Sequence, residues 1–497
     1  MRVRIAGELV DRNETFDVFD KYSGKKIDHL PSMRPEDVAL AVRAADHSIN
    51  ELEKITAFQR RQILDNVADL MVKSRLDLTE MLISESGMCR KDAEFEVNRA
   101  SNVLKMYAAD VLHIQGESLT LDADARGSGR HGYSFRVPVG IVAAISAFNN
   151  PLVLLAHKLG PALAAGNAVV FKPASLTPLS ALMVTEMFVQ AGLPGDALNV
   201  LTGRGEVLGP PLASAPEVRV ITFTGGRETG EQIARAAGAK RLLMELGSIC
   251  PNIICSDADV DFSAKNLVGA AYSFQGQNCL HAQRILVQDE IYEQFRSRFL
   301  NYASSLKIGD PRSPSTSIGP MITETAARRI EDWVNEARER GAQVLIGGKR
   351  SAQFFEPTLL ENVPPDARVS CNEIYGPVSL LIRFSNMDEA VRISNDTDYG
   401  LQAAIFTHSL DNAIYAIRAL RFGTVMVNES SDFRVDMMPF GGFKGSGLGR
   451  EGIRNAIEAM TETKMCAFNL KAFNKSMDES LANIEPQHIC RPNLNVL

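Results

Sequence analysis

The stretch VGIVAAISAFNNPLVLLAHKLGPALAAGNAVVFKPAS, residues 139–175, decides the fold class. It opens with an apolar run as long as a buried strand, continues with an Ala- and Leu-rich helical pattern, and ends in the strand-like NAVVFKPA. A strand, a helix and a second strand in this order form a βαβ unit, whose two strands pair in parallel. The stretch therefore predicts an α/β protein with a parallel, doubly wound sheet.

The same alternation continues along the chain. Helical LSALMVTEMFVQAG and GRETGEQIARAAGA alternate with strand-like ALNVLTG and RVITFTG, and further on YEQFRSRFLNYASSL and AARRIEDWVNEARERGA precede AQVLIGG, LQAAIFT and GTVMVN. Two helical patterns, RPEDVALAVRAADHSI and RRQILDNVADLMVKS, lie near the N-terminus. We therefore predict two α/β domains in succession.

Composition and charge exclude several classes of protein. With 497 residues the chain exceeds one ordinary core, so two or three domains are expected. A formal net charge of −7 and the absence of a dense Lys/Arg run argue against a nucleic-acid partner. The N-terminal MRVRIAGELVDRNETF turns polar too soon for a signal peptide, and no apolar run approaches the roughly 20 residues that cross a bilayer. No membrane partner is expected.

The seven cysteines lie far apart, and none belongs to a CxxC pair. An odd number of scattered cysteines fits reduced thiols better than a disulfide framework or a zinc site. We therefore expect a cytoplasmic protein without a metal site.

Glycines and a lysine follow several predicted strands. Gly205 in TGRGEVLG, and Gly225 and Gly226 in FTGGRETG, lead from a strand into a helical pattern. Such glycines let backbone N–H groups approach a pyrophosphate at a helix N-terminus; ordinary strand-to-helix turns are the alternative. Lys172 and Ser175 end another strand, at the sheet edge where ligands bind in doubly wound folds, and a solvated lysine is the alternative there.

Three residues carry groups suited to nucleophilic catalysis. Glu245 follows an apolar run in LLMELGS, so partial burial would raise its pKa and make it a general base; a solvent-facing glutamate is the alternative. The amide of Asn149, at a strand end, can hold a developing oxyanion or stabilise a turn. Cys279 lies in SFQGQNCLHA, a Gly- and amide-rich loop that gives a substrate access to a thiol, although a lone cysteine is more often buried and inert.

Taken in order, these residues and their flanking blocks resemble the NAD(P)-dependent aldehyde dehydrogenase superfamily, and the resemblance extends to about residue 468. The matching text is FNNPLVLLAHKLGPALAAGNAVVFKPAS, FTGG, MELGSICPNII, GQNC, NEIYGPV and MPFGGFKGSGLGREG. The resemblance implies two doubly wound parallel-sheet domains, a dinucleotide-binding domain (1–118 and 138–247) and a catalytic domain (248–440). A small β excursion for oligomerisation, 119–137 with the C-terminal strand and tail 463–497, completes the expected fold.

The resemblance also implies the catalytic roles. The cysteine that matches Cys279 is the family's nucleophile, which forms a thiohemiacetal and, after hydride transfer, a thioester that water hydrolyses to the acid. The Cys279 N–H and the Asn149 side chain would form the oxyanion hole, and Glu245 would activate the thiol, the water or both. Lys158 matches a lysine implicated in proton movement.

The cofactor residues follow in the same way. Lys172 resembles the family's ribose-binding lysine, Glu373 in NEIYGP would hold the nicotinamide ribose, and Tyr375 would pack beside the nicotinamide. The remaining cofactor positions are Gly205, Gly225, Gly226 and Leu246. Ser175 stands where NAD-preferring relatives often carry Glu, which repels a 2′-phosphate. The expected cofactor is NADP or NAD, with NADP tolerated because Ser175 removes that repulsion.

The substrate side resembles a branch of the family that acts on small hydroxy- or anion-bearing aldehydes such as lactaldehyde, glyceraldehyde and phosphonoaldehydes. Arg434 in SSDFRVDMMPFGG, and Arg99 on a helical pattern, would pair with a carboxylate or phosphonate; structural ion pairs are the alternative for both. Asn278, beside the cysteine, is also expected to contact the substrate. We expect a small polar or anionic aldehyde as the partner, and a homodimer or homotetramer.

Two other functions compete with this interpretation. A CoA-acylating aldehyde dehydrogenase or a thiol hydrolase would use the same cysteine, but CoA-acylating relatives often lack a base at the position of Glu245, and a hydrolase needs no cofactor residues. A non-catalytic structural protein on the same scaffold would not need Asn149, Glu245 and Cys279 together.

Overall fold

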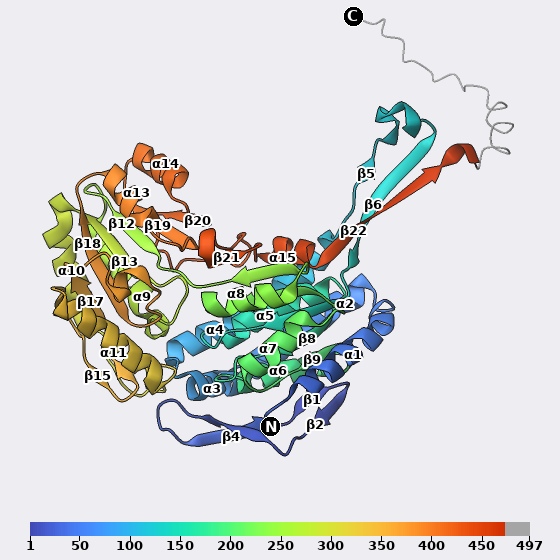
Figure 1. Cartoon of the computed structure of the whole chain (residues 1–497), viewed down its shortest axis with the longest axis horizontal. Coiled ribbons are helices and arrows are strands. Elements are labelled where there is room, and N and C mark those ends of the chain that lie inside the picture. Colours follow the sequence, from blue (N-terminus) through green and yellow to red (C-terminus); the bar gives the residue numbers. More distant parts are fainter. Residues whose placement is uncertain (473–497) are drawn as a thin grey trace, which may run out of the picture. The chain divides into compact units, whose positions relative to one another are not determined.

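The computed structural model describes residues 1–472, so most of the predicted C-terminal tail lies outside the described residues (Figure 1). The chain divides into two compact units, Met1–His113 with Pro138–Met460, and Ile114–Val137 with the chain from Thr461 onward. Within residues 1–472, no helix is both long and apolar enough to cross a membrane.

A six-stranded sheet, in the order β21-β11-β10-β7-β8-β9, organises the first half of the larger unit. Its strands are β7 (Ile141–Ile145), β8 (Ala168–Lys172), β9 (Leu198–Val200), β10 (Val218–Thr224), β11 (Arg241–Glu245) and β21 (Gly447–Leu448). All neighbours pair in parallel except β21, which is antiparallel to β11. The strands predicted in the first βαβ segments are confirmed, whereas β21 comes from residues between the predicted catalytic domain and the predicted C-terminal strand.

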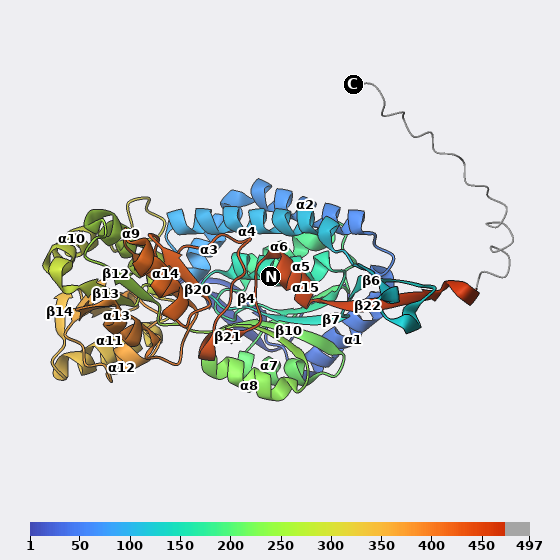
Figure 2. The same ribbon diagram turned by 90° about the horizontal axis from the view of Figure 1, so that it is seen from above.

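Helices cover both faces of this sheet (Figure 2). One face carries α2 (Ala57–Lys73), α3 (Arg75–Ser86), α4 (Arg90–Asp110), α5 (Pro151–Ala164), α6 (Leu179–Gln190) and α15 (Ile453–Ala459). The other carries α1 (Pro35–Leu52), α7 (Gly205–Ser214) and α8 (Arg227–Ala237). The sequence did not reveal α3, because its buried positions include the polar Thr79, Glu85 and Ser86 and so break the apolar stripe that marks a helix.

A second sheet, with seven strands in the order β14-β17-β18-β13-β12-β19-β20, organises the other half of the larger unit. Its strands are β12 (Pro251–Ile254), β13 (Arg284–Gln288), β14 (Gln343–Ile346), β17 (Thr358–Glu361), β18 (Val378–Phe384), β19 (Gln402–Phe406) and β20 (Thr424–Val427). Only the edge strand β14 of this sheet is antiparallel to its neighbour. Two mostly parallel sheets confirm the predicted α/β fold class.

The remaining elements of the larger unit are short hairpins and the helices of the second half. The helices are α9 (Val260–Tyr272), α10 (Tyr292–Ser304), α11 (Glu324–Glu339), α12 (Arg368–Cys371), α13 (Met387–Asn395) and α14 (Leu410–Ala419). The antiparallel hairpins are β1 (Val3–Ile5) with β2 (Glu8–Val10), β3 (Thr15–Phe19) with β4 (Lys26–Pro31), and β15 (Arg350–Ser351) with β16 (Phe354–Phe355).

The smaller unit is a three-stranded sheet. Its strands are β5 (Ser118–Leu119), β6 (Arg130–Pro138) and β22 (Thr461–Asn469), in the order β22-β6-β5. Beyond β22, the Leu470 N–H donates to the Gly129 carbonyl at 2.9 Å. The small β excursion and its C-terminal strand are therefore confirmed as structural elements.

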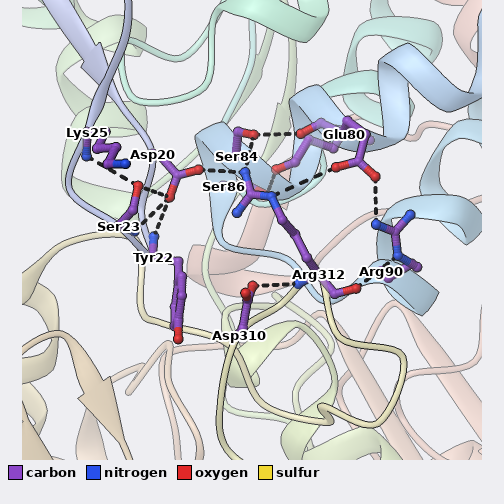
Figure 3. A network of polar contacts seen from close by, with 11 residues as sticks. Asp20, Tyr22, Ser23, Lys25, Glu80, Ser84, Ser86, Arg90, Asp310 and Arg312 are labelled. Atoms are coloured by element: carbon purple, nitrogen blue, oxygen red, sulfur yellow. Dashed lines mark hydrogen bonds and ion pairs between the residues drawn. The ribbon is translucent and has the colours of Figure 1, made fainter.

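A polar network ties the N-terminal hairpin and α3 to a loop of the second half (Figure 3). Arg312 Nη2 donates to Asp20 Oδ2 at 2.6 Å and to Ser84 Oγ at 2.7 Å. Arg90 binds Glu80 through Nη2 at 2.6 Å and the Arg312 carbonyl through Nε at 3.0 Å. Burial opposes ionisation of Asp20, but the Ser23 N–H and the Arg312 guanidinium outweigh it and lower the pKa of this carboxyl. The network therefore joins segments that are far apart in the sequence.

Replacing Arg312 with Ala is expected to destabilise the protein by about 1–3 kcal/mol, because it leaves the Asp20 carboxylate without its charged donor. The midpoint of urea unfolding, followed by circular dichroism, measures the change. Arg328→Ala is the matched control, since Arg328 makes a solvent-exposed i,i+4 pair with Glu324 at 2.8 Å that is worth roughly 0.5 kcal/mol or less. Equal midpoints for the two variants would contradict the structural role of Arg312.

Candidate active site

A cavity of about 1130 Å³ is lined by the carboxyl ends of β7, β8, β10 and β11 and by loops of the second half. Parallel strands bring their carboxyl ends to one edge of a sheet, which is why residues spread over the chain meet there. Every site residue predicted from the sequence lines this cavity except Lys158. These residues are Arg99, Asn149, Lys172, Ser175, Gly205, Gly225, Gly226, Glu245, Leu246, Asn278, Cys279, Glu373, Tyr375 and Arg434.

The loop before Cys279 has an unusual backbone. Phe274, Gln275 and Gly276 have φ angles of 50°, 57° and 65°, all in the left-handed region that non-glycine residues rarely adopt. A Cβ at Gly276 would lie 2.2 Å from the Gly376 carbonyl oxygen, so only glycine fits there. Gln275 Nε2 donates to the Gly87 carbonyl at 3.1 Å. Contacts from both halves of the unit therefore hold the loop that positions the thiol.

The Cys279 thiol is half-buried, and it donates to Asn278 Oδ1 at 3.7 Å. Burial raises the pKa of this thiol well above its ordinary value, the negative charge of Glu245 adds to the rise, and Arg434 opposes it. The thiol is therefore protonated at neutral pH, and its use as a nucleophile needs a base nearby.

Glu245 is the residue predicted to be this base. It ends β11, is 5% exposed, and its Oε2 makes no hydrogen bond among the described residues. Burial raises the pKa of Glu245, the charge of Glu451 raises it further, and Arg434 and Lys158 oppose the rise. A raised carboxyl pKa lets the same side chain accept and return a proton near neutral pH.

Asn149 supplies an amide to the same cavity. It follows β7, is 8% exposed, and its Oδ1 has no hydrogen-bond partner in residues 1–472. A buried amide without an internal partner is costly to a protein unless a ligand uses it. Because Asn149 also lines the cavity, its Nδ2 can donate to an oxygen of a bound molecule, and its Oδ1 can accept a hydrogen bond there.

Lys158 does not line the cavity but lies within α5, fully buried. Its Nζ donates to Thr222 Oγ1 at 3.2 Å and lies 3.7 Å from Glu451 Oε1. Burial lowers the pKa of Lys158, while Glu451 and Glu245 oppose the drop. Lys158 therefore acts on Glu245 through its charge and through Glu451.

Arg434 and Arg99 both line the cavity, and each already has an acidic partner. Arg434 Nη2 lies 3.2 Å from Glu451 Oε2, and its guanidinium stacks on the Phe440 ring with 3.9 Å between Cζ and the ring centroid. Arg99 Nη2 donates to Asp436 Oδ1 at 2.7 Å. The structural ion pairs considered in the sequence analysis are thus present; both side chains also remain on the cavity wall, so their substrate role stays a prediction.

His157 connects these two ion pairs. Its Nε2 lies 3.0 Å from Asp436 Oδ1 and 3.5 Å from Arg434 Nη2, and its Nδ1 lies 3.2 Å from the Tyr107 hydroxyl. Burial, together with the charge of Arg434, lowers the pKa of His157, although Asp436 opposes this. The neutral imidazole therefore bridges the two arginine sites.

The first sheet supplies a polar region suited to a dinucleotide. Lys172 Nζ donates to the Pro173 carbonyl at 3.2 Å and lies 3.5 Å from Ser175 Oγ, which in turn donates to the Gly203 carbonyl at 2.6 Å. Burial lowers the pKa of Lys172 to about 8. Helices α7 and α8 begin at this wall, with Gly226 as the N-cap of α8, and helix N-termini favour phosphates.

Glu373 and Tyr375 face this region from the second half. The Ser248 N–H donates to Glu373 Oε1 at 2.8 Å, and a Cβ at Gly247 would lie 2.5 Å from Glu373 Oε2. Burial raises the pKa of Glu373 to about 7. Tyr375 packs edge-on against Phe148 with 5.7 Å between ring centroids. Two helix N-termini and a buried lysine supply donors, and a carboxylate held by a backbone N–H supplies an acceptor; together they fit NAD(P).

Sequence analysis missed the buried partners Glu451, His157, Asp436 and Asp432. Glu451 lies within the quoted block GLGREG, and His157 directly precedes Lys158, so both were adjacent to recognised residues. Their pairing could not be read from the sequence, because the partners come from α4, α5 and the segment 430–451. No group of three or more His, Cys, Asp or Glu side chains that could hold a metal ion occurs in the part of the chain that the structure describes.

The chain is similar to known proteins over most of its length. The family model "Aldehyde dehydrogenase family" matches residues 9–466. Aspartate-semialdehyde dehydrogenase 1 of Pseudomonas canavaninivorans is 41% identical over 454 residues, which span 91% of this chain and 96% of that protein. 3-Sulfolactaldehyde dehydrogenase of Priestia aryabhattai is 38% identical over 466 residues, spanning 94% and 97%. The structure of NADP-dependent glyceraldehyde-3-phosphate dehydrogenase from Bacillus halodurans C-125, complexed with NADP, is 36% identical and superimposes with a TM-score of 0.92, covering 94% of this chain and 99% of that one.

Arg434→Gln is expected to slow alkylation of Cys279 several-fold at a fixed pH near neutrality, because the guanidinium favours the thiolate. The rate of iodoacetamide modification, followed by mass spectrometry of the Cys279 peptide from pH 6 to 10, gives the midpoint. Arg434→Lys keeps the charge and should stay close to the unmodified protein. A midpoint that is the same with Gln as with Arg would show that Arg434 does not act on the thiol.

Proposed function

Because this chain belongs to the aldehyde dehydrogenase family, we propose that Cys279, Glu245 and Asn149 perform its oxidation of an aldehyde to a carboxylic acid with NAD(P)⁺. The observation that carries this proposal is the single cavity in which these three side chains meet the residues suited to the dinucleotide. The relatives are named as dehydrogenases of aldehydes, and the chain covers nearly their whole length.

The first step is attack of the Cys279 sulfur on the aldehyde carbon. Since burial keeps the thiol protonated, Glu245 accepts its proton as the carbon–sulfur bond forms. The carbonyl oxygen takes up the negative charge of the resulting thiohemiacetal. The Asn149 amide, and the Cys279 N–H, which donates no hydrogen bond within the described residues, stabilise this oxyanion.

Oxidation of the thiohemiacetal to a thioester requires removal of hydride, which is the chemistry that NAD(P)⁺ supplies when bound. Lys172, Ser175, Glu373 and the N-termini of α7 and α8 would hold it. Glu245 releases the proton it took from the thiol to solvent, and it then takes a proton from water as the water attacks the thioester. It returns this second proton to the departing sulfur, so the acid leaves as the Cys279 thiol is restored. Lys158 and Glu451, behind Glu245, adjust its charge during both proton transfers.

The role of Glu245 distinguishes this mechanism from the two competing enzymatic functions, CoA acylation and thiol hydrolysis. Release by coenzyme A would need no base for water, whereas a buried carboxylate in the cavity serves hydrolysis directly. A thiol hydrolase would leave Lys172 and Glu373 without use. Hydrolysis to the free acid therefore accounts for the complete set of residues.

The substrate we propose is a small aldehyde that carries an anionic group. Arg434 contributes most to this inference, since its Nε is buried without a hydrogen-bond partner among the described residues while the side chain lines the cavity. Relatives are named for aspartate semialdehyde, 3-sulfolactaldehyde and glyceraldehyde 3-phosphate, which carry a carboxylate, a sulfonate and a phosphate. A guanidinium binds each of these anions.

Oligomerisation through the smaller unit fits its surface. Large apolar side chains are exposed on its strands and just beyond β22, namely Leu119, Tyr133, Phe135, Met465, Phe468 and Leu470. Exposed apolar clusters of this kind mark contact surfaces between proteins. We propose that β5, β6 and β22 join copies of the chain into a homodimer or homotetramer.

The wild-type protein is expected to reduce NADP⁺ or NAD⁺ faster with 4-oxobutanoate than with the neutral propanal, and Cys279→Ala should lose this activity by more than about 10³-fold. Absorbance at 340 nm measures the rates. Arg434→Gln should raise the KM for 4-oxobutanoate but not the KM for propanal, while the loss of its effect on the Cys279 thiol should lower kcat for both aldehydes to a similar extent. Activity that survives in Cys279→Ala would contradict the nucleophile, while equal rates on the two aldehydes would contradict only the anionic substrate.

Ser175→Glu is expected to lower kcat/KM for NADP⁺ by about tenfold or more and to leave NAD⁺ much less affected, because the new carboxylate would repel a 2′-phosphate. Steady-state rates with each cofactor measure the ratio. Ser175→Gln is the matched control, since it has the same size without the charge. If the cofactor ratio changes equally in both variants, size rather than charge at residue 175 sets the preference.

A further inference from the structure

Asp432 lies on the substrate side of the cavity wall, yet it pairs with no Lys, Arg or His within residues 1–472. Its Oδ2 accepts a hydrogen bond from Ser273 Oγ at 3.1 Å, and its Oδ1 accepts one from Asn278 Nδ2. These two neutral donors satisfy part of the hydrogen-bonding capacity of the carboxylate, but they do not compensate its negative charge. A half-buried carboxylate in this state favours a cation among molecules that enter the cavity.

A comparison with Asp436, four residues further along, shows what Asp432 lacks. Asp436 receives hydrogen bonds from Arg99 and contacts His157, and although burial opposes it, these groups hold the pKa of Asp436 well below its ordinary range. Burial instead raises the pKa of Asp432 to about 7, although Ser273, Asn278 and the charge of the more distant Arg99 oppose the rise. The protein thus compensates one of the two acids internally and leaves the other without a cation.

Three aromatic side chains line the same cavity as Asp432. Phe274 directly follows Ser273, Phe433 directly follows Asp432, and Phe95 lies one turn of α4 before Arg99; all three line the cavity. Phe95 is 57% exposed and Phe433 is 43% exposed, so their rings are available to a ligand. A carboxylate among exposed aromatic rings is the combination that binds an ammonium group.

The position of Asp432 relative to the thiol sets how far this ammonium lies from the reacting carbon. One amide group separates the two, since Asn278 donates to Asp432 through Nδ2 and accepts from Cys279 Sγ through Oδ1, at 3.7 Å. In a short aldehyde attached to the sulfur, an amino nitrogen three bonds from the aldehyde carbon spans a separation of this order. Arg434, whose side chain is nine-tenths buried with a free Nε, offers a separate site for an anion.

We propose that Asp432, with Phe95, Phe274 and Phe433, forms a binding site for the amino group of the substrate, which is a short amino-acid-type aldehyde whose carboxylate lies at the arginine side. This inference rests on the proposed function and narrows its substrate class from an anionic to a zwitterionic aldehyde. Asp432 is a specificity residue in this scheme, because it contacts the substrate away from the reacting atoms.

Four aldehydes of matched structure test the proposal. Propanal carries neither charge, 3-aminopropanal carries only the ammonium, 4-oxobutanoate carries only the carboxylate, and 2-amino-4-oxobutanoate carries both. In the wild-type enzyme, the ammonium should raise kcat/KM about tenfold or more within each pair. Asp432→Asn should reduce both ammonium ratios to near one, mainly through KM, and leave the carboxylate ratios unchanged.

Controls separate this role from the others that Asp432 could have. Glu94→Gln removes an exposed acid of α4 that does not line the cavity, and both ammonium ratios should persist in it. Ratios near one in the wild type, or ratios unaltered by Asp432→Asn, overturn the amino-group site. A loss that is equal for all four aldehydes in Asp432→Asn also overturns it, since Asp432 would then act by positioning Asn278 beside the thiol.

Failure of the proposed function would have a different signature. If the wild-type enzyme reduces neither cofactor with any of the four aldehydes, the oxidation itself is contradicted. Calorimetric titration with L-aspartate and with succinate then decides the inference alone, because the two acids differ only in the ammonium. Aspartate that binds about tenfold more tightly supports the site, and binding that is equal to or weaker than that of succinate overturns it.

Discussion

Burial of ionised side chains beneath the cavity is the constraint on which the rest of the molecule depends. A charge removed from water destabilises a protein unless a partner and hydrogen bonds compensate it. The compensated ionised side chains here are Lys158, Glu451, Arg434, Asp436 and Arg99, and the neutral His157 lies between two of their ion pairs. Because they come from α4, α5 and the segment 430–451, these elements have to pack in one arrangement. The side of these packed elements that faces the cavity forms part of its wall.

The same desolvation sets the chemistry of the cavity. It favours the neutral forms of the Cys279 thiol and the Glu245 carboxyl, while Arg434 favours the ionised form of both and Lys158 favours that of Glu245. Burial is the larger effect, so the pKa values of both groups are raised. A thiol and a carboxyl whose pKa values are both raised by one environment can exchange a proton more readily than if only one of them were shifted.

Much of the fold and of the set of residues that line the cavity could be predicted from the sequence, because the signals are local. Apolar runs identify β7 and β8, and short blocks identify Cys279 with its neighbours. The helix α3 and the edge strand β21 could not be predicted, since tertiary packing rather than their own pattern stabilises them. The sequence also could not show which acidic side chains form ion pairs. Asp432 and Asp436 lie in one short segment, but of these two the fold of residues 1–472 gives a cationic partner, Arg99, to Asp436 alone.

The left-handed backbone of Phe274, Gln275 and Gly276 bears on how the chain folds. Such a conformation costs about 1–3 kcal/mol for each non-glycine residue, so an isolated loop would relax out of it. The carbonyl of Gly87 and the backbone at Gly376, which hold this loop, lie far from it in sequence. The loop can reach its final form only after both halves of the larger unit have docked. A newly made chain therefore does not hold the loop before Cys279 in this conformation until folding of the larger unit is complete.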